Sequence, residues 1–217
     1  MDSRGKIFNI GLPKTGTTSL HAALEALGYR SIHNPLHWRR PVYEGNYRVC
    51  DGYDAVTNFA EHTYPQFDAA YPGSKFILTL RGDVEAWLDS WRRQIGEGRG
   101  NERLDRIINR RTFWKPGAWW WMLRTINRMD GREPVSNLHT RIELFAAYRF
   151  VPERCRYVYE QHRDAVMRYF ADRPDDLLVM DITAGDGWEK LCPFLGVDVP
   201  ADTPFPRRLP QKSWNDR

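Results

Sequence analysis

Apolar residues along this chain gather in short runs, and one of them reads Phe-Ile-Leu-Thr-Leu within residues 75–81, between a Pro-Gly pair and a glycine. A nearly continuous apolar run of this length is typical of a strand that is buried on both faces of a parallel sheet. Runs at residues 6–10 and 176–181 predict two more buried strands, and residues 53–57 predict a shorter one.

Segments with helical spacing separate these runs. Leu20, Leu24 and Leu27 line one face of the segment that follows the first run, and Asp83 is placed to cap a helix after residues 75–81. Residues 32–50, with two prolines and a glycine, predict irregular structure. Further helices are expected at residues 64–71, 102–129, 138–171 and 187–196. Strands that alternate with helices predict an α/β fold of three layers, with helices on both sides of a central parallel sheet.

A glycine-rich segment interrupts this alternation. Residues 96–100 hold three glycines in five positions, which disfavours regular structure and predicts a linker. We expect residues 1–217 to form one domain, with residues 96–150 as a helical insert.

Composition limits the kinds of ligand and cellular compartment that are expected, but it does not identify a function. The chain has 217 residues, a net charge of +4 and a pI of about 9.0, which suits an anionic ligand but is too mildly basic to indicate nucleic-acid binding. Its three cysteines are widely spaced, which predicts free thiols in a reducing, cytoplasmic compartment. The first residues lead almost directly into a strand, so we expect no signal peptide. No apolar stretch approaches the length of a membrane span.

The most informative motif is the sequence GLPKTGTTSL at residues 11–20, between the first strand and the first helix. The first turn of a helix has unpaired N–H groups and a positive dipole, so an anion binds there readily. Gly11 and Gly16 allow a close approach of the backbone, while Lys14 and the hydroxyls that follow Gly16 add donors. This motif predicts a phosphate-binding loop.

The loop differs from that of nucleoside triphosphatases, which reads G-x-x-x-x-G-K-[ST]. Thr17 stands where the lysine of that motif would follow the second glycine, and the lysine lies earlier, at Lys14. We find no acidic strand end suited to Mg²⁺ and no convincing metal-ligand spacing among the histidines. We therefore expect a phosphate ligand and no metal.

The string from Pro13 to Ser19 resembles the 5′-phosphosulfate loop of sulfotransferases, which use 3′-phosphoadenosine-5′-phosphosulfate (PAPS) without a metal. A strand at residues 176–181, followed by GWEKLCPFLG at residues 187–196 and then by PFP, resembles small sulfotransferases whose loop reads GLP-K/R-TGTTSL. The resemblance covers residues 5–30, 51–95 and 152–206. It implies a P-loop-type fold and the product 3′-phosphoadenosine 5′-phosphate (PAP).

The same resemblance implies the residues that bind the nucleotide. Family members place an arginine at the end of the strand matched here by residues 75–81, and a serine on the following helix, both on the 3′-phosphate; Arg81 and Ser90 match these types, with a spacing about one residue longer than usual. Lys14 would stabilise the leaving phosphate and is a catalytic candidate. The expected nucleotide-binding residues are Pro13, Lys14, Thr15, Gly16, Thr17, Thr18, Ser19, Arg81 and Ser90.

The residue that accepts the acceptor's proton is harder to identify. Sulfotransferases place a histidine or carboxylate just after the strand matched here by residues 53–57, but this chain has Asn58, which cannot act as a base. His62 has an ordinary pKa of about 6.5, suited to base chemistry at neutral pH. A surface histidine at a helix start is the alternative. Glu61 is the competing base or, alternatively, a first-turn helix acid. Asp51 and Asp54 are the next candidates.

The segment that contains Trp119, Trp120 and Trp121 is a candidate acceptor region. Three consecutive indoles cannot all face one core, because helical residues are about 100° apart. We expect Trp119 and Trp120 to line an apolar acceptor pocket, with plain core packing or contact with a partner or membrane surface as alternatives. Asn58 is a further substrate-contact candidate.

We therefore expect sulfuryl transfer from PAPS to a hydroxyl or amine of a small, partly apolar or lipid acceptor. A small-molecule kinase is one alternative, disfavoured by the position of Lys14. A non-catalytic adenine-nucleotide-binding protein is the other, and Asn58 keeps it open. Neither the acceptor nor the oligomeric state follows from the sequence.

Overall fold

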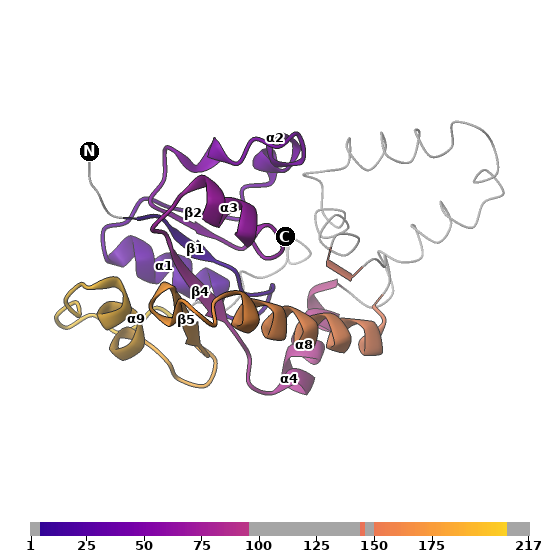
Figure 1. Ribbon diagram of the computed structural model, residues 1–217. Coiled ribbons are helices and arrows are strands. Elements are labelled where there is room, and N and C mark those ends of the chain that lie inside the picture. Colours follow the sequence, from indigo (N-terminus) through magenta and orange to yellow (C-terminus); the bar gives the residue numbers. More distant parts are fainter. Residues whose placement is uncertain (1–4, 96–143, 146–149, 208–217) are drawn as a thin grey trace, which may run out of the picture. The chain divides into compact units, whose positions relative to one another are not determined.

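The computed structural model describes residues 5–95, 144–145 and 150–207 (Figure 1). The chain divides into two compact units. The first consists of residues 1–87 and 159–213, and the second of residues 88–158 and 214–217.

A parallel sheet forms the centre of the first unit. Its strands in the described residues are β1 (Ile7–Asn9), β2 (Ser31–His33), β3 (Ala55–Thr57), β4 (Lys75–Thr79) and β5 (Leu177–Met180). They pair in the order β2-β3-β1-β4-β5, so β1 lies between β3 and β4 (Figure 1). The expected α/β fold, a parallel sheet flanked by helices, is confirmed.

Helices follow β1, β3, β4 and β5 as the sequence predicts. They are α1 (Thr17–Ala26), α2 (Arg39–Tyr43), α3 (Tyr64–Ala70), α4 (Val84–Ile95), α8 (Pro152–Tyr169) and α9 (Trp188–Leu195), with short 3₁₀ helices η1 (Leu36–Trp38), η2 (Arg48–Cys50) and η4 (Pro174–Asp176). Asp83 accepts a hydrogen bond from the Glu85 N–H at 2.9 Å and caps α4, while Gly196 ends α9 in the left-handed conformation.

Successive strand residues pack into two different cores, as the two-residue repeat of a strand requires. On one face, Phe8 and Phe76 pack with Phe67 of α3 and Phe170, which follows α8. On the other face, the side chains of α1 and α9 pack against the sheet; this core contains Ile7, Leu20, Leu24, Ala55, Ile77, Trp188 and Leu191.

This arrangement creates a switch point between β1 and β4. The chain leaves β1 through α1, on one face of the sheet, toward β2. It passes from β4 to β5 through α8, whose Val166 packs on the opposite face. In open α/β sheets, ligands bind at the carboxyl ends of strands where successive connections diverge in this way.

The structure differs from the expectation at residues 32–50. The sequence predicts irregular structure here, but the segment completes the edge strand β2 and contains η1, α2 and η2. β2 has only three residues, Ser-Ile-His, all half-buried. So short an edge strand carries too few apolar positions to stand out in the sequence.

In the second unit, the described residues include part of α4 and the beginning of α8. Trp91 packs on Phe145, with ring centroids 5.3 Å apart, and Cys155 is buried. The predicted linker at residues 96–100 and the residues Trp119 to Trp121 lie outside the described residues. The expectation of a single domain with an insert stays a prediction.

Two global expectations concern membranes and thiols. In the ranges that the structure describes, no helix combines the length and apolar character needed to cross a membrane. All three cysteines of the chain, Cys50, Cys155 and Cys192, are free and buried, and burial raises the pKa of each thiol, that of Cys50 to about 12.

Candidate active site at the carboxyl ends of the strands

The loop after β1 passes so close to β4 that only glycine fits at Gly11. A Cβ atom there would lie 2.0 Å from Thr79 Oγ1 and 2.4 Å from the Thr79 carbonyl oxygen. Real Cβ atoms do not approach other atoms so closely, so any other residue would push the loop away from the sheet. Gly11 therefore sets where the candidate phosphate-binding loop begins.

Two residues of the loop adopt the left-handed backbone conformation. Lys14 has a φ of 72° and Gly16 a φ of 96°. Gly16 is the N-cap of α1, and α1 has neither a side-chain cap nor an acidic residue in its first turn. Its N-terminal N–H groups and its positive dipole end are thus not neutralised by a carboxylate, which is the condition that favours a bound anion.

Buried hydroxyl and amide groups connect the loop to the ends of β1 and β4. The Thr15 hydroxyl donates to the Leu12 carbonyl at 2.7 Å and lies 2.7 Å from Thr79 Oγ1. The Asn9 amide donates to Thr79 Oγ1 at 3.0 Å and to the Ile77 carbonyl at 3.1 Å. Because the Thr15 side chain is fully buried, it shapes the loop, and its backbone N–H remains the candidate group for phosphate binding.

Trp87 of α4 supports the loop from a distant part of the sequence. Its indole N–H donates to the Pro13 carbonyl at 2.9 Å, and the side chain is completely buried. The apolar spacing of α4 predicts Trp87 as a core residue, but gives no sign of this polar contact.

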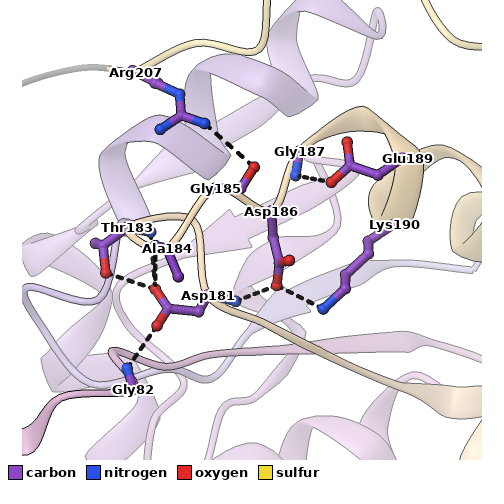
Figure 2. A network of polar contacts seen from close by, with 10 residues as sticks. All are labelled: Gly82, Asp181, Thr183, Ala184, Gly185, Asp186, Gly187, Glu189, Lys190 and Arg207. Carbon is purple, nitrogen blue, oxygen red and sulfur yellow. Dashed lines mark hydrogen bonds and ion pairs between the residues drawn. The ribbon is translucent and has the colours of Figure 1, made fainter.

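Arg81 lies just beyond the end of β4, as predicted. The Tyr159 hydroxyl accepts a hydrogen bond from the Arg81 N–H at 2.7 Å and donates to the Arg81 carbonyl at 2.6 Å. The next residue, Gly82, donates its N–H to Asp181 Oδ2 at 2.6 Å (Figure 2). The backbone that carries the Arg81 guanidinium is therefore held by groups from α8 and from the turn after β5.

Asp181 is itself fixed by its surroundings (Figure 2). Its Oδ1 atom accepts hydrogen bonds from the backbone N–H groups of Thr183 and Ala184 and from the Thr183 hydroxyl, at 2.6–3.0 Å. Its own N–H donates to Asp186, which also pairs with Lys190 at 2.8 Å. A closed turn after β5 thus presents one carboxylate oxygen to the turn after β4.

Ser90 lies on α4 and is half-buried. It belongs to the second compact unit, whereas Arg81 belongs to the first. Its expected role at the 3′-phosphate therefore stays a prediction.

Asn58 follows β3 in the left-handed conformation, with a φ of 56°. Its N–H donates to Asn9 Oδ1 at 3.4 Å, so Asn9 connects the ends of β1, β3 and β4. The Asn58 Oδ1 atom is buried and has no hydrogen-bond partner among the described residues. A buried acceptor without a partner is unfavourable and is available to a donor on a bound molecule.

Glu61 and His62 differ sharply in their surroundings. Glu61 is 5% exposed, and burial raises the pKa of its carboxyl to about 7 despite its own backbone N–H and nearby Arg39. His62 keeps an exposed surface, yet surrounding protein atoms reduce its hydration and, with His162 and Arg39, lower its pKa. Glu61 precedes α3 and is not an acid of its first turn.

His162 also belongs to this region, although its position in the sequence gave no reason to expect it. Its Nε2–H donates to the carbonyl of Ile10, the residue before Gly11, at 2.7 Å. Burial lowers the pKa of His162 below its ordinary value, which favours the neutral ring. No group of three or more potential metal ligands is found within the described part of the chain.

These groups form a candidate phosphate-binding loop, a backbone-anchored arginine and two titratable side chains, Glu61 and His62, in the connection between β3 and α3. Comparison with known families agrees with this chemistry: the model of a sulfotransferase domain family matches residues 6–214, nearly the whole chain. A search of curated proteins gives no match. The chain therefore belongs to the sulfotransferase family.

Proposed function

We propose that this sulfotransferase moves a sulfuryl group from PAPS to a hydroxyl or amine of a small, partly apolar or lipid acceptor and releases PAP. The observation that supports the nucleotide assignment most strongly is the N-terminus of α1. It is preceded by two left-handed residues, contains no acid in its first turn and lies beside the anchored strand end of Arg81 at the switch point.

The donor set fits an anion with two phosphate groups. In our proposal the N–H groups from Thr15 to Ser19 and the Thr17 and Thr18 hydroxyls bind the 5′-phosphate end. Lys14 places its positive charge on the oxygen that becomes the leaving group. Arg81 binds the 3′-phosphate, with Ser90 as its expected partner. None of these contributions requires a metal.

The reaction itself leaves the protein two tasks. The acceptor oxygen or nitrogen forms a bond to sulfur while the bond between sulfur and the 5′-phosphate oxygen breaks, and that electron pair remains on the released phosphate. The acceptor's proton passes to a protein base. Lys14 stabilises the charge that grows on the leaving phosphate, and a side chain after β3 accepts the proton.

We favour His62 as the base over Glu61. Its lowered pKa keeps the ring neutral, and hence able to accept a proton, at neutral pH. Its exposed surface also allows contact with an acceptor, whereas Glu61 is almost completely enclosed. Asn58 would orient the acceptor by offering its unpartnered Oδ1 to the acceptor's O–H or N–H group.

The pH dependence of turnover distinguishes these two bases. If His62 is the base, the rate rises with pH around a midpoint below the ordinary imidazole value, because its pKa is lowered. If Glu61 is the base, the midpoint lies at about 7. His62→Ala should reduce turnover about a hundredfold and leave PAP affinity unchanged; Glu61→Gln is the matched comparison.

The nucleotide assignment is tested by calorimetry with PAP, 5′-AMP and ATP, with and without Mg²⁺. PAP should bind clearly more tightly than AMP without metal, and Arg81→Ala should remove most of that preference. Arg30→Ala is the control, because Arg30 precedes β2 at the opposite edge of the sheet and pairs with Asp54. Tight ATP binding only with Mg²⁺ would favour a kinase. Tight PAP binding without sulfation of any acceptor would favour a non-catalytic nucleotide-binding protein.

A further inference from the structure

The end of β4 carries an interaction that the proposed catalytic roles do not use. The Tyr159 side chain, which is 5% exposed, forms hydrogen bonds with both backbone polar groups of Arg81. The last ladder bond of this strand runs from the Leu80 N–H to the Met180 carbonyl at 2.9 Å. The Tyr159 hydroxyl thus takes over the role of a neighbouring strand at the residue where the sheet ends.

The same tyrosine is linked to the phosphate-binding loop. Its ring packs on Trp87, with centroids 4.7 Å apart and planes inclined by 38°. Trp87 in turn donates its indole N–H to the Pro13 carbonyl. All four residues belong to the first compact unit. One aromatic pair therefore contacts both loops that, in the proposed function, bind the two ends of PAP.

We infer that Tyr159 is a positioning residue for recognition of the 3′-phosphate, and that Trp87, on which its ring packs, positions the loop that binds the 5′-phosphate. The inference rests on the proposed function. Ordering the four rotatable bonds of an arginine side chain on a phosphate costs entropy, and a fixed backbone removes the additional cost of ordering the chain that carries it. Tyr159 forms hydrogen bonds with the N–H and the carbonyl of Arg81, and Asp181 accepts one from the N–H of Gly82. The backbone at Arg81, from which the guanidinium side chain extends, therefore has little freedom to move.

This role can be distinguished from general structural support because Tyr159 and Trp87 act on different phosphates. Tyr159 should affect only the 3′-phosphate, through Arg81, and Trp87 only the 5′-phosphate, through the loop after β1. Tyr159→Phe keeps the ring and its packing on Trp87 but removes the hydroxyl. Tyr169→Phe is the matched control: it makes the same change on the same helix, at a hydroxyl that binds Asp68 at 2.8 Å. Trp87→Phe keeps an aromatic ring but removes the donor to Pro13.

The experiment measures the dissociation constants of PAP and AMP for each variant by calorimetry, with thermal unfolding as a check of folding. Tyr159→Phe should reduce the preference for PAP over AMP by about fivefold or more, the effect of roughly one lost hydrogen bond, and leave AMP affinity unchanged. Tyr169→Phe should change neither constant. Trp87→Phe should weaken PAP and AMP equally and leave the preference intact.

A double variant tests whether Tyr159 acts through Arg81. In the Arg81→Ala background, Tyr159→Phe should produce no further loss of preference, because residues that act as one unit are not additive. Full additivity would overturn the inference. So would a Tyr159→Phe protein that keeps the wild-type preference, or one that loses affinity for PAP and AMP alike.

Failure of the proposed function would look different. A wild-type protein that binds PAP and AMP equally would refute the assignment of Arg81 to a 3′-phosphate. If Tyr159→Phe does not fold, Trp87→Phe still tests the aromatic pair: a changed preference with unchanged AMP affinity would contradict the division between the two phosphates.

Discussion

The ends of β1 and β4 lie beside each other in the sheet but are built in opposite ways. The loop after β1 takes most of its shape from neighbouring residues, because Thr15 bonds to Leu12 and Gly16 caps the helix that follows. Thr79 and Trp87 add support from outside the loop. The turn after β4 is held by Tyr159 and Asp181, which lie 78 and 99 residues away in the sequence. One proposed phosphate site is therefore encoded mostly by local sequence, and the other depends on the finished fold.

This difference has an energetic consequence. The loop after β1 packs directly on β4, so a change in it should disturb the core as well as ligand binding. The turn after β4 is held by hydrogen bonds at its edge, so a change there should alter ligand discrimination with less effect on stability. The following predictions test this distinction, from the largest expected effect to the smallest.

Gly11→Ala should have the largest effect. Its Cβ would lie 2.0 Å from Thr79 Oγ1, so the loop or β4 must move, and we expect a stability loss of about 3 kcal/mol together with loss of PAP binding. Chemical denaturation and calorimetry measure the two effects. Gly52→Ala is the control, because a Cβ at Gly52 would meet nothing within 4 Å. A Gly11→Ala protein with wild-type stability would contradict the close approach.

Glu61, after β3, should give the protein a distinct pH dependence. Burial raises the pKa of its carboxyl from its ordinary value to about 7, so the folded state binds the proton more tightly than the unfolded state. Its contribution to stability is complete below about pH 4.5 and is lost as the pH rises through 7, in total roughly 3 kcal/mol. Unfolding of Glu61→Gln, followed across this range, should show a flatter profile.

His33, at the end of β2, should act in the opposite direction and serves as the internal comparison. Burial and nearby His21 lower its pKa to about 4, so its contribution is present above pH 6.5 and is lost as the pH falls toward 4. Glu61→Gln should remove a fall in stability between about pH 4.5 and 7, and His33→Gln should remove a rise between about pH 4 and 6.5. If both variants changed the slope of the pH–stability profile in the same direction, at least one assignment would be wrong.

Thr15→Val should destabilise the locally encoded site by about 2 kcal/mol. Valine preserves the shape but removes the hydroxyl that bonds to Leu12 and Thr79, which leaves buried polar groups without their partner. Thermal unfolding measures the loss. PAP and AMP should be weakened in parallel, since both carry the 5′-phosphate; a selective loss of PAP would contradict the separation of the two sites.

Asp181→Asn should have the smallest effect on stability, about 1 kcal/mol, but a selective effect on the nucleotide. The amide oxygen of asparagine can replace one carboxylate oxygen, but the NH₂ group then takes the place of the other. That NH₂ group faces either the Gly82 N–H or the N–H groups of the Thr183 turn, and two donors cannot form a hydrogen bond with each other. We expect a reduced preference for PAP over AMP with unchanged AMP affinity. Asp202→Asn, at an exposed position, is the control. Equal weakening of both nucleotides would place Asp181 with the loop after β1.

The contrast between the two strand ends also explains what the sequence could and could not predict. The phosphate-binding loop and the end position of Arg81 follow from short stretches in which glycines, hydroxyls and apolar runs have a local meaning. Tyr159 and Trp87 were recognisable only as aromatic residues at helical spacing. Nothing in the sequence shows that their hydroxyl and indole N–H reach backbone groups near the site.

Asn9 and His162 differ in how far the sequence alone could reveal their hydrogen bonds. A polar residue inside an apolar strand run, as Asn9 is, was a usable signal, because a fully buried amide must find hydrogen-bond partners. His162 gave no such signal, since its partner Ile10 is 152 residues away. Trp119 and Trp120, which the sequence predicts to contact the acceptor, lie outside the described residues, and that role stays a prediction.

The buried cysteines have a practical consequence for following this protein in solution. A thiol reacts with alkylating reagents and oxidants as its thiolate, and burial with a raised pKa leaves almost no thiolate on Cys50, Cys155 or Cys192 at neutral pH. A cysteine introduced by Ala184→Cys, at an exposed position whose backbone N–H alone takes part in the turn that holds Gly82, should therefore be labelled selectively in the otherwise native chain. A fluorophore there would report nucleotide binding beside Arg81 without removal of any natural thiol.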